Sequence, residues 1–269
     1  MLTATLGVVG GWLCAPALAA KARKLVAAFG ALNNPQGLAV DQSNGDVYVA
    51  DTSNHRVMKF TATGELLLGF GGNVGGLGED ACGGLVACGP GTAGSAAGEF
   101  TTAEFVAIDE DPSSPSVGDV YVADIGDGLI SKYTPEGQLV ASWGNNGAGA
   151  TANGQLNGTG TTAGSFGSLA GISVDAAGTL DVLNSASSLF KFSQDGTFES
   201  ELTVARSTEP KGLAVNGAGD LFKVPGSGAV LELNPAGEEV GFISVGQIVR
   251  PGASAFAIEP ASGDLYVVT

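Results

Sequence analysis

One short apolar segment recurs five times along this chain, each time followed by a glycine-containing turn and a second apolar segment. The first segments are GLAVD at 37–41, FVAID at 105–109, GISVD at 171–175, GLAVN at 212–216 and FAIE at 256–259. The second segments are DVYVAD at 46–51, DVYVAD at 119–124, TLDVLN at 179–184, DLFKVP at 220–225 and DLYVVT at 264–269. Apolar runs of this length, bounded by turn residues, predict β-strands that pair as hairpins.

Four of these units continue into a third segment and then, after a turn that contains glycine, into a fourth. The third segments are RVMKF at 56–60, LISKY at 129–133, SLFKF at 188–192 and AVLEL at 229–233. Four short strands per unit, repeated at about 40 residues, are typical of propeller blades. The sequence therefore predicts an all-β propeller of four-stranded blades over residues 20–269, with four full blades and partial first and last units.

The spacing of the units also locates two insertions. Gly171 and Gly212 are 41 residues apart, whereas Glu104 is 67 residues from both Gly37 and Gly171. Insertions of about 25 residues must therefore follow the fourth strands of the first two full blades. They correspond to the Gly/Ala-rich stretches 71–99 and 144–168. Both connect an outer strand to the next innermost strand, so we expect them on one face, either as tolerated low-complexity loops or as a binding lid.

The two ends of the repeat predict a ring that is incomplete within this chain. KLVAAFG at 24–30 matches a fourth strand without a blade before it, and the last unit stops after its second strand. We therefore expect a protein of five to six blades that continues past Thr269, with the N-terminal strand completing the final blade.

Residues 1–19 are predicted to be a cleaved export signal. The stretch from Leu2 to Leu13 is uncharged and mostly apolar, and it precedes the small-x-small sequence Ala17-Leu18-Ala19. No Lys or Arg precedes the apolar stretch, so an uncleaved anchor or a different start remains an alternative. A cleaved signal predicts a secreted or cell-surface protein without a stable transmembrane segment.

The charge of the chain excludes one class of partner. Asp and Glu number 27 against 11 Lys and Arg, a formal net charge of -16 at pH 7. Nucleic acids are bound through clustered Lys and Arg, so we expect a protein or carbohydrate partner and no nucleic acid.

Residues 35–60, PQGLAVDQSNGDVYVADTSNHRVMKF, resemble an NHL repeat, and GDVYVADIGDGLISKYTPEG in the second full blade resembles it less closely. The resemblance implies a propeller that usually has six blades. The connection between the second and third strands of this blade contains Asp51, Asn54, His55 and Arg56. The corresponding connection in the next blade contains Asp124 and Asp127. We expect these side chains to build the turn, with Arg56 pairing to a carboxylate of the neighbouring blade. A binding site is the alternative.

Metal chemistry has little support in the sequence. Lyases that resemble NHL propellers bind zinc through several histidines, whereas His55 is the single histidine here. Calcium is a possible cofactor because Asp41, Asp109 and Asp175 recur in register at the ends of innermost strands. The same residue type also closes the turn that follows such a strand.

Cys82 and Cys88 are predicted to form a disulfide inside the first insertion, because an exported chain meets oxidising conditions. The alternative is two free thiols.

Two functions follow from these observations. The first is a non-enzymatic binding scaffold that engages a protein or glycan through its loops, and the second is a calcium-dependent exported hydrolase or lyase. No GxSxG, P-loop or HExxH motif occurs, which favours the scaffold and leaves no catalytic residue to name.

Overall fold

The computed structural model describes residues 31–144, 167–204, 211–224, 229–244, 255–258 and 265–268. The predicted strand at 24–30, the export signal and nearly all of the second insertion lie outside these residues. No helix among the described residues is long and apolar enough to cross a membrane.

Every sheet is an antiparallel meander in which strands follow their sequence order. The first sheet contains β1 (Leu38–Val40), β2 (Val47–Asp51), β3 (Arg56–Phe60), β4 (Leu66–Phe70) and β5 (Ala81–Gly83), with the short 3-10 helix η1 (Thr52–Asn54) between β2 and β3. The second contains β6 (Ala103–Ile108), β7 (Val120–Asp124), β8 (Leu129–Tyr133) and β9 (Leu139–Gly144).

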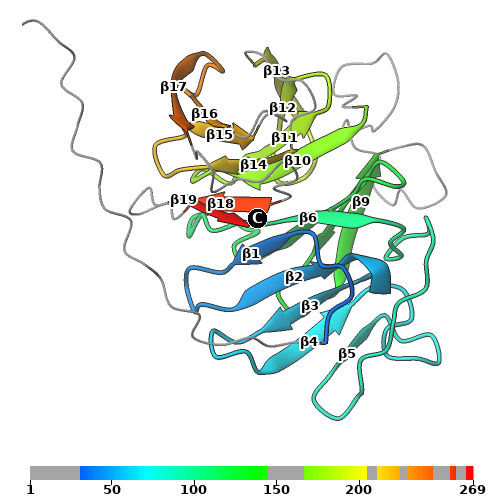
Figure 1. Cartoon of the computed structure of the whole chain (residues 1–269). Helices are drawn as coiled ribbons and strands as arrows, with labels where there is room; N and C mark the ends of the chain where they lie inside the picture. The colour runs from blue at the N-terminus through cyan, green and yellow to red at the C-terminus, as the bar shows by residue number, and fades with distance from the viewer. Residues whose placement is uncertain are drawn as a thin grey trace, which may run out of the picture.

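The next two sheets repeat this order, and the last has two described strands. The third contains β10 (Leu169–Val174), β11 (Leu180–Asn184), β12 (Ser188–Phe192) and β13 (Phe198–Thr203). The fourth contains β14 (Lys211–Val215), β15 (Leu221–Val224), β16 (Ala229–Leu233) and β17 (Glu239–Ser244). The fifth pairs β18 (Ala255–Ile258) with β19 (Leu265–Val268). Figure 1 shows the first strand of each sheet facing the centre, and successive first strands contact each other from β1 to β18.

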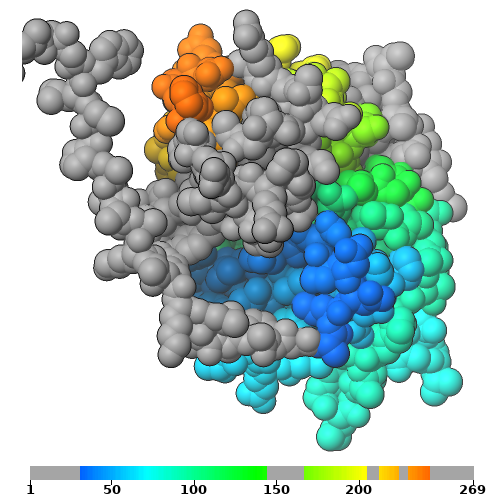
Figure 2. All heavy atoms as spheres, in the orientation of Figure 1, coloured from blue at the N-terminus to red at the C-terminus, as the bar shows by residue number. Residues whose placement is uncertain are grey.

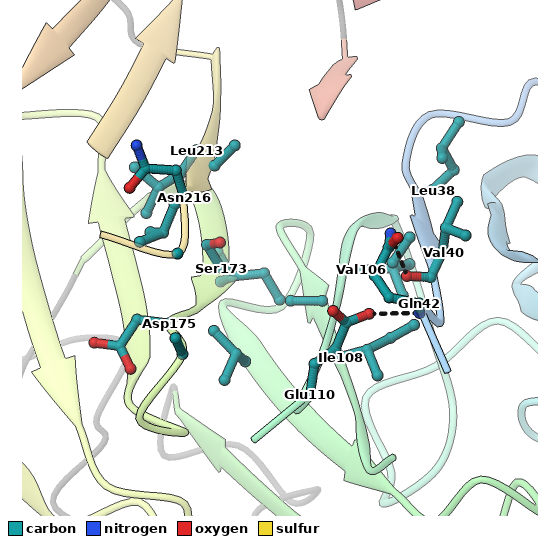
Figure 3. Close-up of a pocket in the computed structure, with 18 of the residues that line it drawn as sticks. Leu38, Val40, Gln42, Val106, Ile108, Glu110, Ser173, Asp175, Leu213 and Asn216 are labelled. Carbon is teal, nitrogen blue, oxygen red and sulfur yellow. Dashed lines mark hydrogen bonds between the residues drawn. The ribbon is translucent and has the colours of Figure 1, made fainter. Parts of the chain in front are cut away.

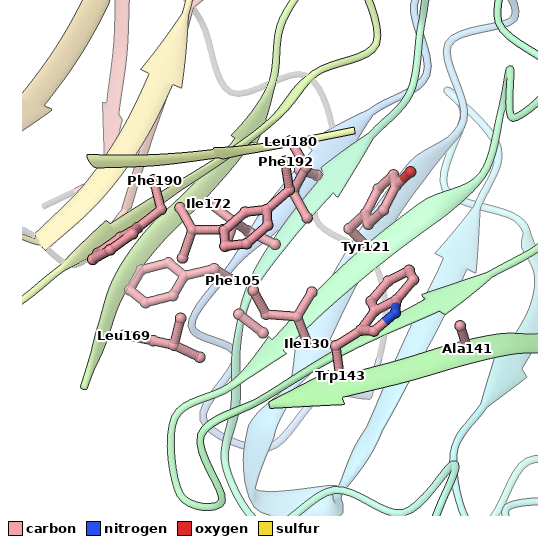
Figure 4. Packing of buried hydrophobic residues seen from close by; sticks show 13 residues of the cluster. Phe105, Tyr121, Ile130, Ala141, Trp143, Leu169, Ile172, Leu180, Phe190 and Phe192 are labelled. Atoms are coloured by element: carbon pink, nitrogen blue, oxygen red, sulfur yellow. The ribbon is translucent and has the colours of Figure 1, made fainter. Parts of the chain in front are cut away.

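The hydrophobic core lies between neighbouring sheets. One cluster joins the second and third sheets and contains Trp143, Tyr121, Phe190 and Phe192, all nearly or fully buried (Figure 4). Similar clusters join the first sheet to the second and the third to the fourth. Side chains alternate across a strand, so the second and third sheets each pack apolar residues against a neighbouring sheet on both faces.

Lysines on the third strands tie consecutive blades together. Lys59 Nζ lies 3.2 Å from an Asp46 oxygen and 5.0 Å from the centre of the Tyr48 ring, and it reaches the carbonyl of Pro135 in the next blade. Lys132 repeats the arrangement, donating to the carbonyl of Gln194 in the third sheet at 3.2 Å. The repeat therefore encodes contacts between blades as well as the strands within them.

Candidate functional site

A cavity of about 660 Å³ lies where the innermost strands of the first four sheets meet (Figure 3). Its walls are mostly aliphatic and come from equivalent positions of the four strands: Leu38 and Val40 on β1, Val106 and Ile108 on β6, Ile172 and Val174 on β10, and Leu213 and Val215 on β14. Mostly apolar cavities of this size are typical of small-molecule sites.

Glycines bring the innermost strands together at the end opposite the polar part of this cavity. A Cβ on Gly37 would lie 2.2 Å from the carbonyl oxygen of Glu104, and one on Gly171 would lie 2.7 Å from the backbone of Gly212. Only glycine permits this approach. Residues of the turns that follow these strands complete the cavity.

The polar groups of the cavity gather at the turns. Glu110 is half-buried, and its Oε1 accepts a hydrogen bond of 2.8 Å from the backbone N–H of Gln42. Burial raises the pKa of Glu110, the Gln42 bond opposes that shift, and the charges of Asp41 and Asp109 add to it. Figure 3 shows Glu110 pointing towards the cavity and Asp175 pointing away from it. No Lys, Arg or His is found among the described residues that line the cavity.

The three calcium candidates are engaged in turns. Each carboxylate accepts hydrogen bonds from residues that follow it: Asp41 from Ser43 and Asn44, Asp109 from Asp111 and Ser114, and Asp175 from Ala177 and Thr179. Within the described part of the chain, no three His, Cys, Asp or Glu side chains lie together as a metal site would require. These geometries correspond to turn closure, in which the carboxylate replaces a backbone acceptor.

The Asn-His-Arg triplet holds three segments of chain together. Asp51 is fully buried and accepts hydrogen bonds from the backbone of Asn33, from Asn54 and, at 2.7 Å, from Arg56 Nε. The guanidinium of Arg56 also donates to the carbonyl of Gly89 in the first insertion at 2.8 Å. The expectation that Arg56 pairs with a carboxylate of the neighbouring blade is therefore wrong, because Asp51 in its own blade is nearer.

His55 occupies the left-handed backbone region, with φ of 52°, at the end of η1. Its Nδ1 lies 3.0 Å from the carbonyl oxygen of Thr101, which precedes β6, so Nδ1 carries the proton of this hydrogen bond. His55 thus joins the first blade to the second. It does not line the cavity between the innermost strands, which we call the axial cavity.

Asp124 and Asp127 act in the same way in the second blade. Asp124 accepts hydrogen bonds from the backbone amides of Thr101, Thr102 and Gly126, and Asp127 accepts one from the Thr101 hydroxyl. Asp51 and Asp124 therefore share one role, which is to fix the chain that enters the innermost strand of their own blade.

The first insertion is an ordered structure rather than a plain loop. Its strand β5 extends the first sheet beyond β4, and Cys82 forms the predicted disulfide with Cys88. Val74 is fully buried beneath it. Figure 2 shows this segment, in turquoise, projecting from the lower edge of the molecule.

Two leucines stand at the tips of this insertion with exposures of 107% for Leu77 and 106% for Leu85. Backbone hydrogen bonds close the first tip between Gly76 and Glu79, and a bridge between Gly83 and Val86 closes the second inside the disulfide ring. Leu77 has φ of 55°, a left-handed conformation that costs a leucine about 1 kcal/mol. Neither burial nor turn chemistry accounts for a leucine there.

Sequence reasoning missed Glu110 and Gln42. It selected Asp41 and Asp109, which are one residue earlier in each case, because aspartates recur in register. The signal for Glu110 was its place in the Asp109-Glu110-Asp111 run. Asp109 and Asp111 accept hydrogen bonds from residues that follow them, whereas Glu110 accepts one from Gln42 of the first blade.

Residues 32–60 match the NHL repeat. No curated protein matches the sequence. Among solved structures, virginiamycin B lyase from Staphylococcus aureus is 13% identical with a TM-score of 0.51, over 87% of this chain and 62% of that one. Glutaminyl cyclase from Myxococcus xanthus is 17% identical with a TM-score of 0.52, over 87% and 84%. A streptogramin B lyase is 12% identical with a TM-score of 0.51, over 87% and 61%.

These likenesses define the class of fold. The chain is all-β, carries an NHL repeat and resembles six-bladed propellers, which confirms the predicted fold class. It spans less than two thirds of the length of the two lyases. At such identities the likeness concerns the fold alone, because one propeller architecture supports many unrelated functions.

Proposed function

We propose that this protein is a secreted or cell-surface binding scaffold without catalytic activity, which engages a protein partner through the leucine-tipped insertion of its first blade. The observation that carries the proposal is Leu77, fully exposed in a left-handed conformation that glycine or asparagine adopts at lower cost. Backbone strain retained at an exposed position supports a role in binding.

The construction of the insertion suits a preorganised contact. Two hydrogen bonds of 2.7 Å hold the first tip: the backbone N–H of Gly78 donates to Asn73 Oδ1, and the backbone N–H of Asn73 donates to Asp80 Oδ1. The disulfide holds the second tip. A rigid loop loses little conformational entropy on binding, so most of the burial of each leucine adds to affinity.

The chemistry of the tips favours a protein over a carbohydrate or an anionic surface. Two projecting leucines fit apolar pockets, which proteins provide. Glu79 and Asp80 follow Leu77, and the net charge of the chain is -16, so a partner with a basic rim around its pockets complements this surface. Anionic lipid would be repelled by the same charge.

The test measures binding of labelled protein to the surface of the cells that produce it. We expect the affinity of the Leu77→Asn and Leu85→Ser double variant for the cell surface to fall about tenfold or more. The reason is that burial of each leucine side chain contributes on the order of 2 kcal/mol to binding. Asparagine tolerates the left-handed conformation, so the variant should unfold at the same temperature or slightly higher.

A matched control replaces Val240 and Phe242, exposed residues on the outer strand of the fourth blade, with serine. We expect this control to bind as the natural chain does. Equal binding by all three proteins would overturn the proposal. Deleting the whole insertion is a poorer test, because Val74 and the contacts of Arg56 would be lost with it.

A further inference from the structure

We propose that the axial cavity is a binding site for an apolar molecule that carries one cationic amine, with the ammonium group held by Glu110. This site is separate from the leucine-tipped insertion, which extends the outer edge of the first sheet, whereas the cavity lies among the innermost strands.

The walls of the cavity define the body of the ligand. Eight aliphatic residues from four blades line the cavity, and Leu38 among them keeps 38% of its surface exposed. A volume of about 660 Å³ accommodates a bicyclic or larger hydrocarbon. Binding of such a hydrocarbon removes apolar surface of the ligand and of the cavity walls from water, and this transfer supplies most of the affinity.

Glu110 defines the polar end. One of its oxygens accepts the Gln42 amide, which fixes the carboxylate against the wall, while the group points towards the cavity (Figure 3). The charges that act on it are those of Asp41 and Asp109, both negative, and no cation is found among the described residues that line the cavity. Lys191 Nζ lies 3.9 Å from Asp175 Oδ2, but it pairs more closely with Asp181 Oδ1, at 2.7 Å.

The polarity of this end excludes an anionic ligand and selects a cation. A carboxylate in a half-buried apolar setting is incompletely solvated, so an ammonium donor recovers interaction that water does not fully supply. A neutral alcohol of the same shape would donate a weaker hydrogen bond, and a carboxylate would repel Glu110.

Isothermal titration calorimetry with three probes of one shape tests the site: 2-(1-naphthyl)ethylamine, the corresponding alcohol, and naphthylacetate. We expect the amine to bind one to one and about tenfold more tightly than the alcohol, with naphthylacetate weakest. Leu38→Trp fills the cavity and should weaken the amine and the alcohol alike.

Glu110→Gln keeps an acceptor for the Gln42 amide and removes the charge, so it should bring the amine down to the affinity of the alcohol. Glu65→Gln removes an exposed carboxylate outside the cavity and should change nothing. Absence of binding by the amine, equal affinity for amine and alcohol, or equal effects of the two glutamine variants would each overturn the proposal. The Leu77 and Leu85 double variant should bind the amine normally, which separates this site from the insertion.

Discussion

Lys223 is the least expected residue in the core. It stands in the second strand of the fourth blade, at the position that Val49, Val122 and Val182 occupy in the other three sheets. Its side chain is fully buried, and its Nζ has no hydrogen-bond partner among the described residues. Burial lowers the pKa of Lys223 to about 8, which Glu239 only partly opposes.

We predict that Lys223→Val raises the thermal unfolding temperature at pH 7. The folded chain holds this amine with a pKa of about 8, against roughly 10.4 when unfolded, a difference of about 3 kcal/mol at neutral pH. The cost is complete below pH 8 and disappears as the pH rises to about 10.4, since the unfolded chain binds more protons in that interval.

The measurement is calorimetry of both chains between pH 7 and 10. The advantage of the valine variant should shrink as the pH rises, and a constant advantage would show that charge burial is not the cause. Lys59→Met is the matched control, because Lys59 is paired with Asp46 and its loss should lower the unfolding temperature.

Asp51 supports a second prediction at this scale. Asp51→Asn leaves the buried guanidinium of Arg56 without its carboxylate, and breaking a buried pair in this way costs about 3 kcal/mol or more. We expect the unfolding temperature to fall by about 6 °C or more for a chain of this size. His55→Asn, which keeps the left-handed conformation, should cost far less. Comparable losses from both variants would contradict the central role of Asp51.

The insertion is the element in which packing matters most. Gly69 on β4 lies beneath the disulfide, and a Cβ there would be 2.7 Å from Met58 Sδ and 2.9 Å from Cys82 Sγ. Gly69→Ala should therefore detach β5 and expose residues 71–99 to limited proteolysis, at a cost of about 1–3 kcal/mol. Gly89→Ala, whose Cβ would meet its nearest atom at 3.5 Å, should leave cleavage unchanged. Equal protease resistance of both variants would contradict this packing.

At the scale of the whole molecule, the sequence predicted the blades well because each strand is a local pattern that recurs. The Asp-based turns and the disulfide were also visible as local signals. The strand β5 was not, since Ala81-Cys82-Gly83 becomes a strand only by pairing with Leu68-Gly69-Phe70. The cavity was missed for the same reason, because it requires four innermost strands to meet around Glu110.

The proposed binding function requires the tip of the insertion to contact a partner. Photo-cross-linking in the producing cells tests this directly, with a photoreactive leucine analogue in place of Leu85 and, as control, in place of the exposed Val117. We predict one discrete cross-linked protein from position 85 and none from position 117. The absence of a product from position 85, or the same product from both positions, would contradict the account.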